Sequence, residues 1–288
     1  MTIGSLTESH SIRSPDHVEY GSGAIAALES FAADRAIDTA LVVTDEFLAE
    51  SGVVDAPVAR LEAAGVDVEI YDGVAPEPKL SMVEAAAERV ADRDLVVGVG
   101  GGSSMDTAKL AAALAEHDRP VRDLLGMDNV PGETGPLALV PTTAGTGSEV
   151  THIGVFADER EGNVKKVVFS PYLFADLAAV DPDLTKTLPP GVAAATGLDA
   201  LTHAIESYVS VLRTPYTDTL ARRAVELIGE NLRPAVTQGP DNDEARANIR
   251  SLEQRRRLLV DQIDAQVLTI AERLAADERF AQITSQEV

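Results

Sequence analysis

The chain has 288 residues, which is enough for one large domain or two ordinary ones with a core that needs no disulfides. With 45% hydrophobic residues, 21 glycines and 15 prolines, it lacks the composition of a disordered or fibrous protein. The formal net charge of −23 argues against nucleic acid or an anionic membrane surface as partners, and the absence of cysteine excludes disulfides, thiolate metal sites and cysteine nucleophiles.

Up to about Pro189, short apolar runs alternate with longer amphipathic stretches, which is typical of βαβ units and a doubly wound parallel sheet. We expect strands at Ala40–Thr44, Val66–Tyr71, Leu95–Val99 and Leu137–Val140, and helices at Asp55–Ala64, Leu80–Arg93 and Ser103–Ala115. Two further alternating segments, Ile153–Phe156 and Val164–Phe169, flank the polar turn Asp158–Asn163 and predict a β-hairpin beside the sheet.

The pattern changes near Leu188, where Pro189 and Pro190 suit the first turn of a helix and no convincing strand follows. We expect helices at Val192–Ala195, Leu198–Val211, Thr217–Asn231 and Glu244–Phe280. The sequence therefore predicts two domains, an α/β domain over residues 1–188 and an all-helical domain over residues 189–288.

The strongest local motif is a strand that runs into three glycines and then a helix, with Gly100, Gly101 and Gly102 followed by Ser103. Backbone without Cβ can approach a pyrophosphate closely, and the amides and positive end of the following helix stabilise its charge. The spacing departs from G-x-G-x-x-G because Ser103 stands where the last glycine would be. On the glycines alone, a tight strand-to-helix turn is an equal alternative to a phosphate site.

A second polar loop, PTTAGTGSE at residues 141–149, follows the fourth predicted strand. Thr142, Thr143 and Ser148 would bring hydroxyl groups to the carboxyl edge of the sheet, where open α/β sheets bind their ligands. Asp45 follows the first predicted strand and could accept hydrogen bonds from a ribose or an adenine amine. Its alternative role is to cap the helix that starts at Glu46.

The third signal is a carboxylate and an imidazole four residues apart, Asp199 and His203, on a predicted helix. Both side chains would project from one face and could grip one cation, for which oxygen plus nitrogen suits Fe(II), Zn or Mn. Without other observations, such a pair is more often a surface or capping interaction.

These segments together resemble the iron-containing (group III) alcohol dehydrogenases, which share their fold with glycerol dehydrogenase and dehydroquinate synthase. The motifs that carry the resemblance are GGGSSMDTAK at 100–109, PTTAGTGSEVT at 141–151, VDPDLTKTLPP at 180–190 and GLDALTHAIESYVS at 197–210. It implies a Rossmann-like nucleotide-binding domain, a helical domain, and NAD(P)-linked interconversion of a small alcohol with an aldehyde or ketone.

Carried onto this sequence, the resemblance implies roles for the candidate residues. Asp45 would face the adenosine end of NAD, with NADP as the alternative cofactor, and the glycines and Ser103 the pyrophosphate. Thr142, Thr143 and Ser148 would lie along the cofactor, and Asp106 would orient polar groups there. Asp199 and His203 would be the first two ligands of Fe(II) or Zn(II). The catalytic machinery would consist of the metal site alone, and a homodimer would be in keeping with the family.

The resemblance weakens toward the end of the sequence, where it continues to about residue 247. The family has two further histidine ligands downstream, whereas the last histidine of these 288 residues is His203. Residues 249–288 diverge and carry an apolar stripe at three-and-four spacing that predicts one amphipathic helix. Its members are Val260, Ile263, Val267, Ile270, Leu274 and Ala281. This stripe would pack on the incomplete helical domain or, as an alternative, on a second subunit.

Two hypotheses of function follow. The first is a metal-dependent alcohol dehydrogenase with an incomplete metal site. The second is a catalytically dead nucleotide-binding remnant of the family that assembles through its C-terminal helix. The acidic, lysine-poor composition also favours a protein adapted to concentrated salt, with an ordinary acidic enzyme as the alternative. Residues 1–20 lack a signal-peptide pattern, so we expect a cytoplasmic location.

Overall fold

The computed structural model describes residues 12–186, 188–211 and 213–237. Six strands form one sheet in which every neighbouring pair is parallel, in the order β1-β9-β6-β4-β2-β3. Their bounds are β1 His17–Tyr20, β2 Thr39–Asp45, β3 Asp67–Val74, β4 Leu95–Gly100, β6 Leu137–Pro141 and β9 Leu177–Val180. Helices cover both faces of this sheet, which is why its central strands are continuous apolar runs in the sequence.

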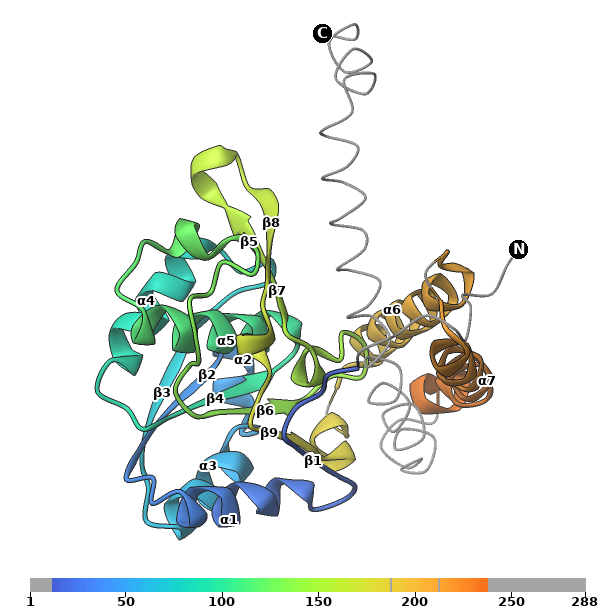
Figure 1. Cartoon of the computed structure of the whole chain (residues 1–288). Coiled ribbons are helices and arrows are strands. Elements are labelled where there is room, and N and C mark those ends of the chain that lie inside the picture. The colour runs from blue at the N-terminus through green and yellow to red at the C-terminus, as the bar shows by residue number, and fades with distance from the viewer. Residues whose placement is uncertain (1–11, 187, 212, 238–288) are drawn as a thin grey trace, which may run out of the picture.

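Five helices accompany these strands. They are α1 Ala27–Asp34, α2 Glu46–Ser51, α3 Asp55–Ala63, α4 Leu80–Val90 and α5 Gly102–Glu116. On one face of the sheet, Leu28 of α1 and Leu61 of α3 are fully buried in one core cluster. On the other face, Val83 of α4 and Leu110 of α5 lie in a second cluster, so that the two helix pairs lie on opposite sides of the sheet (Figure 1). The sheet is therefore a central layer between two cores, as the sequence pattern predicts.

The strand order reverses between β2 and β4, because β3 lies beyond β2 while β6 and β9 lie beyond β4. Val43 of β2 pairs with Gly98 of β4, and Gly100 of β4 pairs with Pro141 of β6. Parallel pairing brings the carboxyl ends of these three strands to one edge. Such a switch point is where open α/β sheets form a crevice for ligands.

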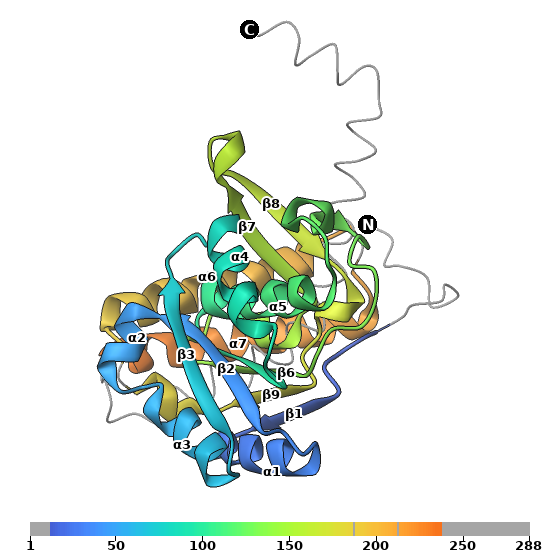
Figure 2. The same ribbon diagram turned by 90° about the vertical axis from the view of Figure 1, so that its left-hand side faces the viewer.

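A second sheet of three strands stands beside the first, in the order β5-β8-β7. Its strands are β5 Gly126–Met127, β7 Ile153–Asp158 and β8 Val164–Phe169. The last two are antiparallel, with Ile153 opposite Phe169, which confirms the predicted hairpin. Figure 2 shows the hairpin rising away from the main sheet.

Short 3-10 turns connect several of these elements. They are η1 Ala24–Ala26, η2 Val121–Leu124, η3 Ser148–Val150, η4 Glu159–Glu161, η5 Pro171–Leu173 and η6 Pro182–Thr185. Of these, η3 matters most for the candidate site, because it ends the polar loop that follows β6.

The helical part consists of α6 Pro190–Val209 and α7 Pro215–Thr237, which lie side by side at the edge of the α/β part (Figure 1). The two separate helices predicted at 192–195 and 198–211 are one helix, because Gly197 remains helical at the contact with α7. A Cβ on Gly197 would lie 2.3 Å from Leu232 Cδ1, so the missing side chain lets α7 approach. Within the described residues no strand follows β9.

Two expectations remain predictions here. The domain boundary at residue 188 is compatible with the change from sheet to helices, and the predicted helix Glu244–Phe280 lies outside the described residues. Among the described helices, none combines the length and the hydrophobicity needed to cross a bilayer.

Candidate functional site

The three glycines make the turn from β4 into α5. Gly100 has φ +150°, and a Cβ there would lie 2.6 Å from Ser104 Oγ and 3.2 Å from Leu48 Cδ1. Gly101 is the N-cap of α5 and has no side chain to accept a hydrogen bond from the first-turn amides. Those amides lack partners within the helix and lie at its positive end. The bend therefore presents bare backbone donors, which is the arrangement that binds anions.

The polar loop after β6 lies directly beside this bend. The Thr142 amide donates to the Gly100 carbonyl oxygen at 2.9 Å, which extends the pairing of β6 with β4. A Cβ on Gly101 would lie 3.5 Å from Thr143 Cγ2, and one on Gly102 would lie 3.0 Å from Cγ2 of Thr146. The two loops that the sequence placed at the same sheet edge are therefore in close proximity. Ser103, in the first turn of α5, is half-buried in the same place.

Asp45 ends β2 at this edge, and its carboxylate caps α2. Its Oδ1 accepts a hydrogen bond from the Leu48 amide at 2.9 Å, and Asp45 has the extended backbone of an N-cap. Leu48 in turn approaches the Gly100 position. The capping role that the sequence left open is therefore the one formed in the structure, and Asp45 still stands next to the glycine bend.

Asp106 and Ser148 meet in a buried polar network, in which Lys109 is the third member. The Ser148 hydroxyl donates to Asp106 Oδ1, and the Val155 amide donates to Asp106 Oδ2 at 3.1 Å. Lys109 Nζ donates to Ser148 Oγ at 2.6 Å and lies 3.6 Å from Asp106 Oδ1. Both charges are buried, with the Lys109 side chain fully inaccessible. The network thus joins α5 to η3.

The remaining contacts of Lys109 extend the network into β7. Its Nζ donates to Thr151 Oγ1 at 3.2 Å and to the Ile153 carbonyl oxygen at 2.9 Å, so with Ser148 it uses all three ammonium protons. Sequence reasoning missed Lys109 as a site residue. The signal was present, because a lysine among the small apolar residues of KLAAALA has to find polar partners once that helix is buried.

The polar loop also touches the helical part of the chain. A Cβ on Gly145 would lie 2.7 Å from Thr196 Cβ and 2.8 Å from its carbonyl oxygen, and Ala144 packs against Ala235 of α7. Gly145 is therefore pressed against the backbone of α6. The loop contacts α5 on one side and the α6–α7 pair on the other, so it forms the junction between the sheet and the helices.

Asp199 and His203 lie on α6, as the sequence predicts. His203 Nε2 is 3.6 Å from Asp199 Oδ1, and the side chains are 31% exposed for His203 and 42% exposed for Asp199. At 100° per residue, both lie within about 60° of Thr196 around the helix, on the side that touches Gly145. Within the described residues no group of three or more Asp, Glu and His side chains is arranged to hold a metal ion.

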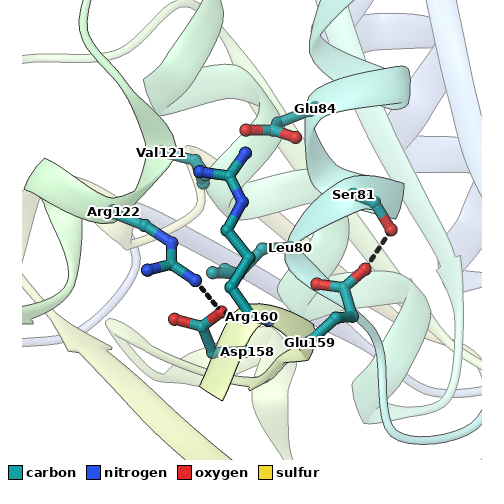
Figure 3. A pocket seen from close by; sticks show the side chains of 8 residues that line it. All are labelled: Leu80, Ser81, Glu84, Val121, Arg122, Asp158, Glu159 and Arg160. Atoms are coloured by element: carbon teal, nitrogen blue, oxygen red, sulfur yellow. Dashed lines mark hydrogen bonds and ion pairs between the residues drawn. The ribbon is translucent and has the colours of Figure 1, made fainter. Parts of the chain in front are cut away.

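A pocket of about 240 Å³ lies between α4 and the turn that joins β7 to β8, and it contains none of the predicted site residues (Figure 3). Its polar lining consists of Ser81, Glu84, Arg122, Asp158, Glu159 and Arg160. Arg122 forms an ion pair with the buried Asp158, and the Ser81 hydroxyl donates to Glu159. Burial raises the pKa of Glu159, but the Ser81 hydroxyl, the backbone amides of Glu159 and Ser81 and the charge of Lys79 together lower it by more, so that the pKa lies below its ordinary value. Asp158 and Glu159 therefore each have a partner within the pocket lining.

Most of the chain is similar in sequence to known proteins. The family model for iron-containing alcohol dehydrogenases matches residues 15–182, and the model for the C-terminal part of the Fe-containing alcohol dehydrogenase family matches residues 193–251. The chain is 50% identical over 206 residues to long-chain-alcohol dehydrogenase 1 of Geobacillus thermodenitrificans (strain NG80-2), covering 70% of this chain and 51% of that protein. The chain spans about half to three fifths of the length of the curated relatives that it matches.

Two solved structures are similar in fold as well. The sulfoacetaldehyde reductase from Bifidobacterium kashiwanohense in complex with NAD+ is 30% identical with a TM-score of 0.79, over 88% of this chain and 67% of that one. The archaeal halo-thermophilic Red Sea brine pool alcohol dehydrogenase ADH/D1 is 29% identical with a TM-score of 0.81, over 91% of this chain and 66% of that one.

Proposed function

The chain belongs to the iron-containing alcohol dehydrogenase family, and from this premise we propose that it binds NAD at the glycine bend and interconverts a small alcohol with its aldehyde or ketone. The observation that carries the proposal is the close approach of Gly101 and Gly102 to Thr143 and Thr146. Because the two glycines carry no side chains, the threonine loop can lie against the start of α5. A cofactor diphosphate there would receive amide hydrogen bonds and the favourable end of the helix dipole.

The residues around the bend would either contact the cofactor or position the loop that does. Gly100, Gly101, Gly102 and Ser103 would bind the diphosphate, and Thr142 and Thr143 would flank the cofactor toward the helical part. Asp106 and Ser148 are buried with Lys109, so they would position this loop and not contact the cofactor directly. When bound, the nicotinamide accepts or supplies the hydride, and the protein contributes alignment.

NAD is favoured over NADP by the carboxylate at the end of β2. Asp45 uses one oxygen to cap α2 and keeps its acidic group beside the bend, where it would repel a 2′-phosphate. The NAD+ complex of the related sulfoacetaldehyde reductase is consistent with this choice. NADP is the alternative, and comparing the dissociation constants of NADH and NADPH distinguishes the two cofactors.

Asp199 and His203 are the candidate ligands of the metal ion. Fe(II) or Zn(II) would use Asp199 and His203, whose carboxylate and imidazole are suitable donors. Two protein ligands fall short of the three or four that such ions use in stable sites, and the described residues provide no third. The second candidate is a nucleotide-binding relative without catalytic activity.

One set of measurements on the purified chain separates the two candidates. NADH fluorescence titration measures nucleotide binding, elemental analysis measures bound iron and zinc, and NADH oxidation against a panel of aldehydes measures turnover. Binding together with turnover supports the dehydrogenase. Binding with neither metal nor turnover supports the non-catalytic relative, and the absence of any nucleotide binding contradicts both.

We also propose that the protein is adapted to concentrated salt, is located in the cytoplasm and forms a homodimer. The net charge of −23 and the similarity to a halo-thermophilic enzyme support the first. Screening of self-repulsion should raise the urea midpoint of unfolding between about 0.1 M and about 2 M KCl, and an unchanged or lower midpoint would argue against salt adaptation. Cell fractionation and sedimentation velocity test the other two.

A further inference from the structure

Phe47 is an aromatic side chain that takes no part in the core. It lies in the first turn of α2 and is 63% exposed, more than any other phenylalanine or tyrosine in the described part of the chain. The next residue, Leu48, is the one that holds this short helix in place, because it is buried in a core cluster and approaches the Gly100 position. The packing of α2 therefore leaves the ring of Phe47 available to a ligand.

The register of the main sheet places α2 beside the glycine bend. Val43 of β2 pairs with Gly98 of β4, and two residues further on these strands end at Asp45 and Gly100. Neighbouring strands lie about 5 Å apart, so the ends of β2 and β4 are adjacent. Phe47 follows Asp45 by two residues, which keeps its ring within one helical turn of the end of β2.

The residues around the ring are acidic. Asp45, Glu46 and Glu50 bring three carboxylates to α2 and its N-cap, and neither lysine nor arginine occurs between residues 36 and 59. Glu50 comes three residues after Phe47, so the two side chains are neighbours on the helix. Carboxylates repel phosphate groups and accept hydrogen bonds from neutral donors. This surface therefore suits the adenosine end of a dinucleotide, which carries an amine and hydroxyl groups.

We propose that Phe47 stacks on the adenine ring of NAD and is a further determinant of cofactor affinity. The inference rests on the proposed function, because it takes the diphosphate to lie at the glycine bend. With the diphosphate there, the nicotinamide half extends toward the polar loop and the helical part, and the adenosine half extends over the end of β2. The adenine then meets the exposed ring, and Glu50 accepts a hydrogen bond from its amine.

Substitutions at position 47 that keep or remove the aromatic face test the stacking. Phe47→Ala and Phe47→Leu should each raise the dissociation constant of NADH about tenfold in a fluorescence titration, because both lose the face on which the base stacks. Phe47→Trp keeps an aromatic face and should stay within twofold of wild type. Full affinity in Phe47→Ala or Phe47→Leu would overturn the proposal, and so would a tenfold loss in Phe47→Trp.

Two partial ligands show which half of the cofactor the ring contacts. ADP-ribose carries the adenosine and the diphosphate without nicotinamide, and Phe47→Ala should weaken its binding about tenfold, as it does for NADH. Reduced nicotinamide mononucleotide has no adenosine, and its dissociation constant should change less than twofold. Equal losses for NADH, ADP-ribose and the mononucleotide would mean that the substitution disturbs the bend itself, which contradicts a contact with adenine.

Tyr172→Ala is the matched control for loss of an exposed aromatic side chain. Tyr172 is 41% exposed and lies in η5, which precedes β9 and is therefore at the amino edge of the sheet, opposite the bend. Its substitution should leave NADH affinity unchanged, and a loss equal to that of Phe47→Ala would refute the assignment. A wild-type chain that binds none of the three ligands contradicts the proposed function itself. NADH binding that is indifferent to position 47 contradicts only the present inference.

Discussion

Lys109 Nζ lies 2.6 Å from Ser148 Oγ, in the interior and between a helix and the end of the polar loop. This contact joins residues far apart in the sequence, since Lys109 is on α5 and Ser148 starts η3. Through it, the loop that begins at Thr142 is anchored to the same helix whose first turn forms the glycine bend. The relative position of the two candidate binding loops therefore depends on a buried ammonium group.

Lys109→Met should destabilise the protein by about 3 kcal/mol, because it leaves the buried Asp106 carboxylate without its cationic neighbour. The free energy of urea unfolding measures this effect. Lys165→Met is the matched control, because the Lys165–Glu77 pair is exposed and should contribute less than about 1 kcal/mol. A similar small loss for both variants would mean that the buried network is not a major anchor.

Gly102→Ala should weaken NADH binding about tenfold, because the added Cβ would lie 3.0 Å from Thr146 Cγ2 and push the threonine loop away from the start of α5. NADH fluorescence titration gives the dissociation constant. Gly229→Ala provides the control, since a Cβ at this position on α7 meets nothing within 4 Å. It should leave NADH binding unchanged and stabilise the helix by up to about 1 kcal/mol. If Gly102→Ala bound NADH with unaltered affinity, the glycine bend would not be part of the NADH site.

Gly145→Ala should destabilise the junction between the sheet and the helical part by about 2 kcal/mol. The added Cβ would lie 2.8 Å from the Thr196 carbonyl oxygen, and backbone atoms of α6 cannot rotate aside as a side chain can. Thermal unfolding followed by circular dichroism measures the loss. Gly191→Ala, on the same helix and with nothing within 4 Å, should cost far less. A loss of equal size at both positions would show that the junction is not tightly packed.

The pKa of Glu69 lies below its ordinary value of 4.5, because Arg89 and then Arg93 donate hydrogen bonds to its carboxylate. A lowered pKa in the folded state adds stability above pH 4.5, and this contribution disappears as the pH falls through the lowered value. Glu69→Gln should therefore cost less than about 1 kcal/mol at pH 7, given its partial exposure.

The pH dependence provides the check on that assignment. The difference in urea midpoint between wild type and Glu69→Gln should shrink as the pH drops below 4.5. Glu226→Gln removes a carboxylate from the exposed Arg223 pair and serves as the control for loss of a surface charge. A difference for Glu69→Gln that stays constant down to acid pH would exclude the two arginines as its cause.

Some elements were beyond what the sequence could predict. The strands β1 and β9 have four residues each, and α1 and α2 are short, so their periodicity is too brief to distinguish from loop. The sequence predicts two helices on either side of Gly197. In the structure it remains helical, because its missing side chain is where α7 packs.

The sequence by itself determined the α/β class, the order of the two candidate binding loops and the i,i+4 spacing of Asp199 and His203. These features depend on neighbouring residues, whose spacing sets which side of a strand or helix they occupy. Only the tertiary structure decided that Lys109 is buried against Ser148, that Gly145 abuts Thr196, and that α7 covers one side of α6. Each of these contacts joins distant segments, so it depends on how the cores pack and not on any local pattern.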